Sequence, residues 1–152
     1  MTMSRICSRL FLGGIKDAER LAAANPAGIT AVISLCAEEV LPRRRDVTYV
    51  RIPIDDARPV PLPQFEAVMT AIAEHIRSGR VLLHCGAGMS RSPIFAAAWM
   101  HRCGYLCVEN ALLEIADLRP VIDPSPVLLK SVKEHLKARP AGTSLTFGRD
   151  DE

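Results

Sequence analysis

One stretch of the chain combines a potential nucleophile, glycines and a cation at short spacing. Cys85 follows the run Val-Leu-Leu-His at residues 81–84, and Arg91 stands six positions after Cys85. A short apolar run of this kind predicts a buried strand. Beyond the loop, Ser92 and Pro93 open an Ala-rich apolar segment. Since Ser favours the N-cap and Pro the first helical position, we expect a helix that starts at Pro93 with Ser92 as its N-cap.

A loop between a strand and a helix N-terminus is suited to binding phosphate. Its successive backbone N–H groups can converge on an anion, and the helix end adds partial positive charge. Glycines in the loop permit close backbone approach and positive φ. Arg91 has the planar fork that holds two phosphoryl oxygens, and all of these groups favour the nucleophilic thiolate of Cys85. The expected phosphate-binding residues are Gly86, Ala87, Gly88, Met89, Ser90 and Arg91.

The motif resembles that of a known enzyme family. His84-Cys85, five intervening residues and Arg91-Ser92 resemble the signature of the cysteine-dependent protein phosphatases, in particular the small, atypical dual-specificity type. Residues 8–14 resemble the opening strand of that family, and residues 118–122 resemble the end of a helix behind the loop. The family often has Pro-Asn where this chain reads Asp-Pro-Ser-Pro at residues 123–126.

Besides the nucleophile, such a reaction needs a group that can donate and accept a proton. After Cys85 attacks phosphorus, the leaving oxygen must be protonated and a water must then be activated, so a carboxyl has to come from another loop. Asp55 and Asp56 both follow a predicted strand, and spacing alone does not separate them. The resemblance selects Asp56. From their positions beside Cys85, we also expect Ser92 to donate a hydrogen bond to the departing sulfur, in addition to its N-cap role, and His84 to orient the loop by hydrogen bonding.

The resemblance implies a metal-independent phosphoprotein phosphatase that hydrolyses phosphotyrosine, with phosphoserine and phosphothreonine as further substrates and without a cofactor. A phosphoinositide or RNA 5′-phosphate phosphatase is the enzymatic alternative, although lipid-directed relatives tend to carry lysines in the loop and residues 86–90 contain none. A phosphopeptide-binding module without turnover would be expected to lose the nucleophile, which this chain keeps. A rhodanese-like sulfurtransferase also uses a loop cysteine, but Arg91-Ser92 and an upstream aspartate are not expected in such an enzyme.

Composition excludes several classes of protein. The chain has 152 residues, of which 49% are hydrophobic and 24% charged, which predicts one globular domain over residues 1–138. Residues 139–152 are polar and aperiodic, and we expect a disordered tail there. A net charge of +2 does not favour a nucleic-acid partner held by bulk charge. No apolar run reaches the roughly 18 residues of a membrane span, so no membrane partner is expected.

The cysteines indicate a reducing compartment. The chain has five, at positions 7, 36, 85, 103 and 107, an odd number without Cys-x-x-Cys or zinc-ligand spacing. We therefore expect reduced thiols, no metal site, and a cytoplasmic protein with access to the nucleus if the source is eukaryotic. Except for Cys85, we interpret them as structural residues. The expected partner is a phosphorylated protein or peptide, and the oligomeric state is left open.

Alternating periodicities predict an α/β fold. A short strand or hairpin is expected at residues 6–12, and strands at residues 29–35, 47–54 and 81–84. Helices are expected at residues 15–24, 63–77, 93–103, 107–118 and 123–137. Continuous apolar strands belong to sheets covered on both faces, and ligands of such sheets bind at the carboxyl ends of the strands. The family resemblance makes this a central, mostly parallel five-stranded sheet with helices on both faces.

Overall fold

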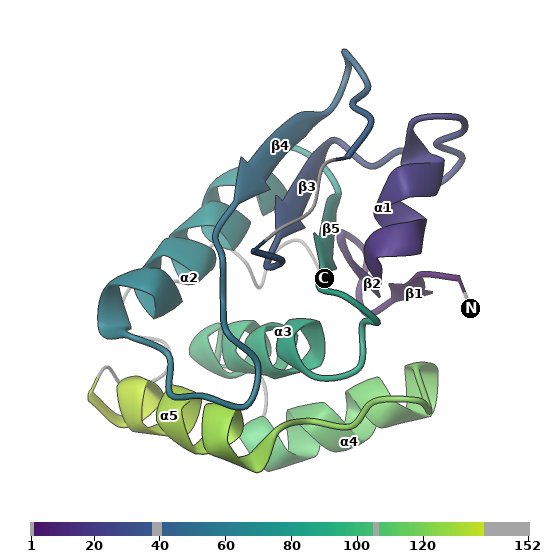
Figure 1. Cartoon of the computed structure of the whole chain (residues 1–152). Coiled ribbons are helices and arrows are strands. Elements are labelled where there is room, and N and C mark those ends of the chain that lie inside the picture. Colours follow the sequence, from purple (N-terminus) through teal and green to yellow (C-terminus); the bar gives the residue numbers. More distant parts are fainter. Residues whose placement is uncertain (1, 38–40, 105–106, 139–152) are drawn as a thin grey trace.

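The protein is built on a five-stranded sheet with helices on both faces (Figure 1). The computed structural model describes residues 2–37, 41–104 and 107–138, so the expected tail at residues 139–152 lies outside the described residues. The strands have the spatial order β1-β2-β5-β3-β4. Their bounds are β1 (Ser4–Arg5), β2 (Leu10–Gly13), β3 (Ala31–Ser34), β4 (Thr48–Arg51) and β5 (Val81–His84).

The central strand β5 determines where the site forms. Both of its neighbours, β2 and β3, run parallel to it, and Gly13 and Ser34 are each in register with His84. β4 is parallel to β3, and β1 pairs antiparallel with β2. The expected mostly parallel sheet is therefore confirmed. Because three parallel strands end at the same level, Cys85 emerges at the carboxyl edge of the sheet, where ligands bind in such folds.

The helices divide unequally between the two faces. Figure 1 shows α1 on one side of the sheet, and α2 and α3 on the other, with α4 and α5 packed beyond α3. Within the described part of the chain, the helices are α1 (Ile15–Leu21), α2 (Leu62–Ile76), α3 (Arg91–Arg102), α4 (Val108–Leu118) and α5 (Pro126–Ala138). α3, which follows the candidate loop, is thus enclosed by other elements.

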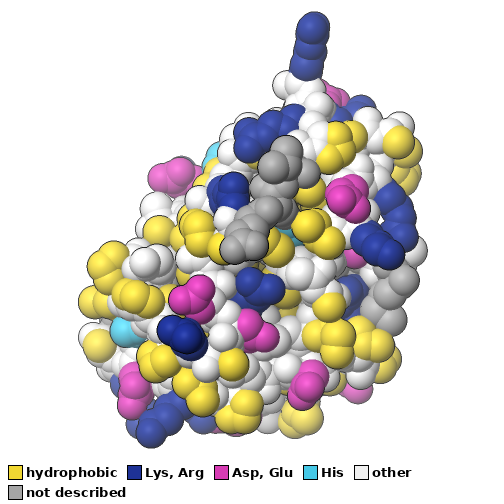
Figure 2. Space-filling view, in the orientation of Figure 1, with side chains coloured by type: hydrophobic (Ala, Val, Ile, Leu, Met, Phe, Trp, Pro, Cys, Tyr) yellow, Lys and Arg dark blue, Asp and Glu magenta, His cyan; other side chains and the backbone are white. Residues whose placement is uncertain are grey.

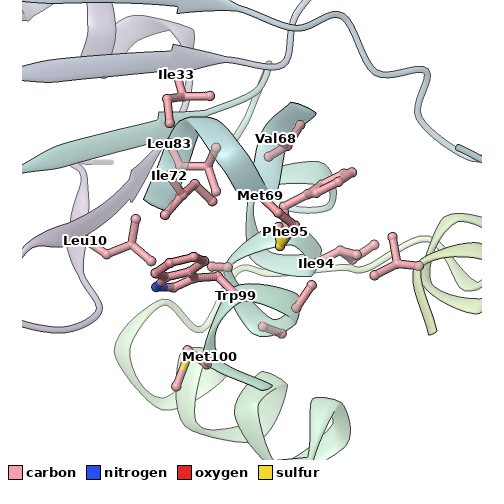
Figure 3. Close-up of a cluster of buried hydrophobic side chains, with 14 of the residues drawn as sticks. Leu10, Ile33, Val68, Met69, Ile72, Leu83, Ile94, Phe95, Trp99 and Met100 are labelled. Atoms are coloured by element: carbon pink, nitrogen blue, oxygen red, sulfur yellow. The ribbon is translucent and has the colours of Figure 1, made fainter. Parts of the chain in front are cut away.

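Side-chain alternation along the strands produces two separate cores. Phe11, Val32 and Leu82 point to the face covered by α1 and pack with Ala18 and Leu21. Their neighbours in the same strands point the other way into the larger core under α2 and α3. Figure 3 shows that larger core, in which Val68, Met69 and Ile72 of α2 and Ile94, Phe95 and Trp99 of α3 gather against Leu10, Ile33 and Leu83 of the sheet.

Several predicted elements are longer than the observed ones. The strands expected at residues 29–35 and 47–54 are four-residue strands, because each pairs only along the four residues of its neighbour. The helix expected at residues 15–24 ends at Leu21, where the backbone turns to tighter i−3 hydrogen bonds. The last helix begins at Pro126 rather than at residue 123, because residues 123–125 make contacts to the loop instead.

The helices and the surface of the described residues can be compared with those expected for a membrane span. None of the described helices is long and apolar enough to cross a bilayer. Figure 2 shows acidic and basic side chains interspersed on the face that Figure 1 presents. The exposed large apolar residues are Leu62, Met89, Leu113, Leu118, Val121 and Val127. Met89 is notable among them, because it belongs to the loop after Cys85.

A half-buried ion pair joins the two helices of the larger core. The side chain of Arg102 on α3 is 2% exposed and forms a bidentate pair with Glu66 on α2, at 2.7 and 2.8 Å. Its guanidinium also lies 5.1 Å from the Phe65 ring centroid. A buried charge costs several kcal/mol to desolvate, so this guanidinium depends on its partner.

Removing that partner should destabilise the fold. Glu66→Ala leaves the Arg102 guanidinium buried without its carboxylate, and we expect the free energy of unfolding to fall by about 3 kcal/mol. Equilibrium urea denaturation should show a lower midpoint with an unchanged m-value. Glu74→Ala, an exposed position on the same helix, should change stability by less than about 0.5 kcal/mol. Equal stability of the two variants would contradict the structural role of the pair.

Candidate active site

The Cys85 thiol lies buried at the N-terminus of α3. The residue is 2% exposed, and its sulfur accepts a hydrogen bond from the Ser92 backbone N–H at 3.5 Å. The Ser92 hydroxyl is 3.4 Å from the same sulfur, so the expected contact between these side chains is present. Because Ser92 is the second residue of the helix, the sulfur faces the positive end of the helix dipole. The sulfur thus lies within hydrogen-bond distance of both the N–H and the hydroxyl of Ser92.

The expected N-cap role of Ser92 is wrong. α3 begins at Arg91, and Ser90 occupies the N-cap position without making a side-chain capping bond. The first turn of a helix has N–H groups without partners inside the helix, and Ser92 directs its own to the sulfur. Pro93 becomes the third helical residue, where a missing N–H costs no hydrogen bond.

All carbonyl groups of the loop are held from outside. From Cys85 to Ser90, the carbonyl oxygens accept hydrogen bonds of 2.6–3.3 Å, in turn from His84 Nδ1, Ile15 N, Arg119 Nη2, Arg119 Nε, Asp123 N and Ile94 N. In a trans peptide the N–H points opposite to the C=O. Carbonyls that turn outward therefore leave the N–H groups of the loop free to converge inward on an anion.

Two glycines, Gly14 and Gly88, let the loop pack closely against the end of β2. Gly88 has φ +73°, and a Cβ there would lie 2.6 Å from Arg119 Nη2 and 2.8 Å from the Gly13 carbonyl. A Cβ on Gly14 would lie 2.8 Å from the Gly86 carbonyl oxygen. Gly86 itself does not adopt a positive φ. The left-handed conformation permitted at both loop glycines is thus used at Gly88 alone.

Arg119 is a structural support of the loop that the sequence did not reveal. It is 2% exposed, and besides the carbonyls of Ala87 and Gly88 it donates to the Thr2 carbonyl at 2.9 Å and the Ser4 hydroxyl at 3.1 Å. A single guanidinium thus connects the loop to the N-terminal strand. The family-like segment at residues 118–122 was the available signal, but nothing in it distinguished this arginine from a surface residue.

Arg91 is anchored so that part of its guanidinium faces the loop. Nη1 donates to the carbonyls of Ile54 at 3.1 Å and Leu35 at 3.4 Å, which follow β4 and β3. Nη2 lies 3.3 Å from the position that a Cβ on Gly86 would take. The backbone bonds restrain the long side chain, which lowers the entropy cost of placing its fork on two oxygens of a phosphoryl group.

The structure separates Asp56 from its neighbour Asp55. Asp56 lines the same cavity as Cys85, and its Oδ1 accepts a hydrogen bond from the Ser90 hydroxyl at 2.8 Å. Asp55 is exposed and is not among the lining residues. Ala57, the next residue, has φ +58°, a strained conformation for a residue with a Cβ. That tight turn directs the Asp56 carboxyl back toward the loop.

The segment that follows Asp56 is also bound to α5 through Val60. Val60 N donates to the Ser131 hydroxyl at 2.9 Å, and the Val60 carbonyl accepts from Ser131 at 3.3 Å and from His135 Nε2 at 2.6 Å. The His135 ring stacks on Phe65, with centroids 5.3 Å apart. Neither Ser131 nor His135 carried a recognisable signal in the sequence, because both are ordinary helix residues. Their contacts restrain the segment that carries Asp56.

These residues enclose a cavity of about 270 Å³. Its lining consists of Asp56, Cys85, Ala87, Met89, Ser90, Arg91 and Asp123. The expected nucleophile, cation, acid and loop residues thus meet at one place, while Gly86 and Gly88 form the loop behind it. His84 is fully buried, and its ring faces the Cys85 carbonyl rather than the cavity. Asp123 was not foreseen as a lining residue.

Two carboxyl groups have clearly shifted pKa values, and both lie away from this cavity. A hydrogen bond from Arg44 lowers the pKa of Asp46, and one from Lys133 lowers the pKa of Glu109. Both pairs are on the surface, where such interactions contribute little to stability. They play no part in the chemistry of the cavity.

Comparison with known proteins identifies similar sequences. A family model described as dual specificity phosphatase, catalytic domain, matches residues 10–138. Human dual specificity protein phosphatase 15 is 32% identical over 127 residues, covering 82% of this chain and 43% of that protein. Rat dual specificity protein phosphatase 18 is 32% identical over 130 residues, covering 81% of this chain and 61% of that protein. The chain therefore spans about half the length of these curated relatives.

Solved structures share the whole architecture. The crystal structure of human DUSP28 is 26% identical with a TM-score of 0.78, covering 89% of this chain and 96% of that chain. A mouse putative dual specificity phosphatase, complexed with zinc tungstate, also has a TM-score of 0.78 at 26% identity, covering 90% of this chain and 89% of that chain. The predicted fold class is confirmed by these matches.

The packing of Gly88 predicts a sensitive position in the loop. Gly88→Ala forces an L side chain into φ +73° and against Arg119 and Gly13, which should lower the free energy of unfolding by about 2 kcal/mol or more. It should also weaken binding of tungstate or vanadate, measured by the rise in melting temperature that the oxyanion produces. In Gly86→Ala the new Cβ meets one atom, Nη2 of the flexible Arg91 side chain, at 3.3 Å. This variant should therefore lose less unfolding free energy than Gly88→Ala. A Gly88→Ala protein as stable as Gly86→Ala would contradict this packing.

Proposed function

The chain belongs to the dual specificity phosphatase family, and on that basis we propose that it hydrolyses phosphotyrosine, phosphoserine and phosphothreonine in proteins without a metal ion. One observation carries the proposal: the sulfur of Cys85 lies at the N-terminus of α3, in the same cavity as Arg91 and Asp56. These three residues supply a nucleophile, a clamp for phosphoryl oxygens and a proton donor.

In the first step, the Cys85 thiolate attacks phosphorus and the bond from phosphorus to the substrate oxygen breaks. Asp56 gives its proton to the leaving oxygen, so the products are a neutral alcohol or phenol and a cysteinyl phosphate. Arg91 and the inward N–H groups hold the equatorial oxygens, which carry dispersed charge in the transition state. The Ser90 hydroxyl occupies Oδ1 of Asp56, which leaves Oδ2 to carry the transferred proton.

In the second step, water attacks the cysteinyl phosphate. The Asp56 carboxylate takes a proton from this water, inorganic phosphate forms, and Cys85 leaves as a thiolate. A thiolate is a better leaving group when a hydrogen bond meets its developing charge, and both donors of Ser92 lie 3.4–3.5 Å from the sulfur. Ser92 therefore acts on the departing sulfur, and Asp56 acts in both steps.

The lining of the cavity supports a phosphoprotein substrate over a phosphoinositide. Arg91 is the one basic residue among the described residues that line it, and the other charged residues are the acids Asp56 and Asp123. A headgroup with additional phosphates would need further cations to neutralise it. A phosphorylated amino-acid side chain presents a single phosphate, which Arg91 and the loop amides can neutralise.

The nucleophile can be tested with an aryl phosphate in the presence of EDTA. The protein should hydrolyse it, vanadate should block the reaction, and Cys85→Ser should abolish turnover, because a serine hydroxyl is not ionised at neutral pH. Cys107→Ser is the matched control, since Cys107 is exposed at the start of α4 and should retain near-normal turnover. A requirement for added metal, or hydrolysis by Cys85→Ser, would refute the mechanism.

The acid can be identified from the pH dependence of kcat/KM. A general acid must be protonated, so the rate should fall as pH rises through its titration, which gives the profile a basic limb. Asp56→Asn should lower the rate by about 10²-fold or more and remove that limb. Asp55→Asn should keep both the limb and most of the rate, because Asp55 does not line the cavity. The reverse result would transfer the role to Asp55.

A further inference from the structure

A second carboxylate residue, Asp123, lines the cavity beside the proposed machinery. It is exposed, and it lines the cavity together with Cys85, Arg91 and Asp56. The proposed reaction uses one acid, Asp56, and gives Asp123 no part in either step. Asp123 is the first residue of the Asp-Pro-Ser-Pro segment at residues 123–126, which precedes α5. Its place in the cavity calls for a physical explanation.

The backbone holds Asp123 in a defined position. Its N–H donates to the Met89 carbonyl at 2.6 Å, and two residues later the Ser125 N–H donates to the Ser90 hydroxyl at 3.0 Å. Between these two bonds stands Pro124, whose ring restricts the backbone further. Because both anchors are residues of the phosphate-binding loop, Asp123 stays beside the loop. A substrate that reaches Cys85 enters a cavity that Asp123 lines.

An apolar side chain, Met89, lines the cavity together with Asp123. Met89 is 37% exposed, lines the same cavity and is joined through its carbonyl to Asp123. Lys and Arg side chains have a long apolar stem and a charged head, so they bind best where an apolar side chain lies next to a carboxylate. Met89 can contact such a stem while Asp123 pairs with the head. A phosphate or carboxylate in the same place would instead be repelled by Asp123.

Resting on the proposed phosphatase function, we infer that Asp123 is a specificity-determining residue. It favours phosphorylated peptides with Lys or Arg beside the phosphorylated residue, and it disfavours peptides with a second phosphate or an acidic residue there. Arg91 does not compensate, because its Nη1 is engaged by backbone carbonyls and the rest of its fork is directed at the bound phosphate. For an exposed pair, the expected discrimination between Arg and Glu at the sensitive position is about threefold to tenfold in kcat/KM at low salt.

A set of phosphotyrosine peptides tests the inference. Each carries Arg, Ala, Glu or phosphothreonine at one of the four positions nearest the phosphotyrosine, and kcat/KM is measured at low and high ionic strength. At one or more positions, the wild-type protein should prefer Arg over Ala, and Ala over Glu and phosphothreonine. Salt should weaken this preference, because the interaction is between exposed charges.

Variants then assign the preference to one side chain. Asp123→Asn should bring the ratio of Arg to Glu peptides close to one, and Asp123→Lys should invert it. Asp117→Asn on α4, an exposed aspartate outside the cavity, should keep the wild-type ratio. A wild-type protein that hydrolyses aryl phosphate but treats Arg and Glu peptides alike overturns this inference alone, as does an unchanged ratio in Asp123→Asn. Failure to hydrolyse aryl phosphate overturns the proposed function, and this inference with it.

Discussion

The outward orientation of six consecutive carbonyl groups is the constraint on which the site depends. A loop whose carbonyls turned inward would repel an anion, since each oxygen carries partial negative charge. From Cys85 to Ser90, every carbonyl instead accepts a hydrogen bond from outside the loop. Buried polar backbone groups must be paired, so the surrounding structure prescribes the direction of each peptide plane. The converging N–H groups are a consequence of that arrangement.

Four of these six carbonyls, those of residues 86–89, are satisfied by donors from distant parts of the chain. Ile15 belongs to α1, Arg119 follows α4, and Asp123 precedes α5. Each is brought to the loop because β5 is the central strand, with α1 on one face and α3 on the other. Stability of the fold and geometry of the site are therefore coupled through the same contacts. Arg119 is the clearest case, since it binds both the loop and the backbone of Thr2, and Arg119 and Thr2 are 117 residues apart in sequence.

Asp56, the proposed acid, is positioned by a second set of contacts, and Ser90 belongs to both sets. Ser90 belongs to the phosphate-binding loop, yet its hydroxyl donates to Asp56 and accepts from the Ser125 N–H. The loop, the acid and the segment before α5 are thus joined at one oxygen atom. Val60, held by Ser131 and His135, restrains the other end of the acid-bearing segment. Cys85 and Asp56, the proposed nucleophile and acid, are therefore positioned relative to each other before a substrate binds.

The sequence by itself determined the features that depend on neighbouring residues. Strand, loop and helix around Cys85, the spacing to Arg91, and the alternation of strands with helices are local patterns, and all are present in the structure. Local patterns misplaced several element ends by two or three residues. The helix expected to start at Pro93 begins at Arg91, and the expected strands are shortened to the residues that pair with a neighbouring strand. Only the tertiary structure showed that Asp56 lines the cavity and Asp55 does not, that Arg119 supports the loop, and that Asp123 also lines the cavity. Those placements depend on contacts across 30 or more residues, and periodicity along the chain contains no information about which distant side chains will meet.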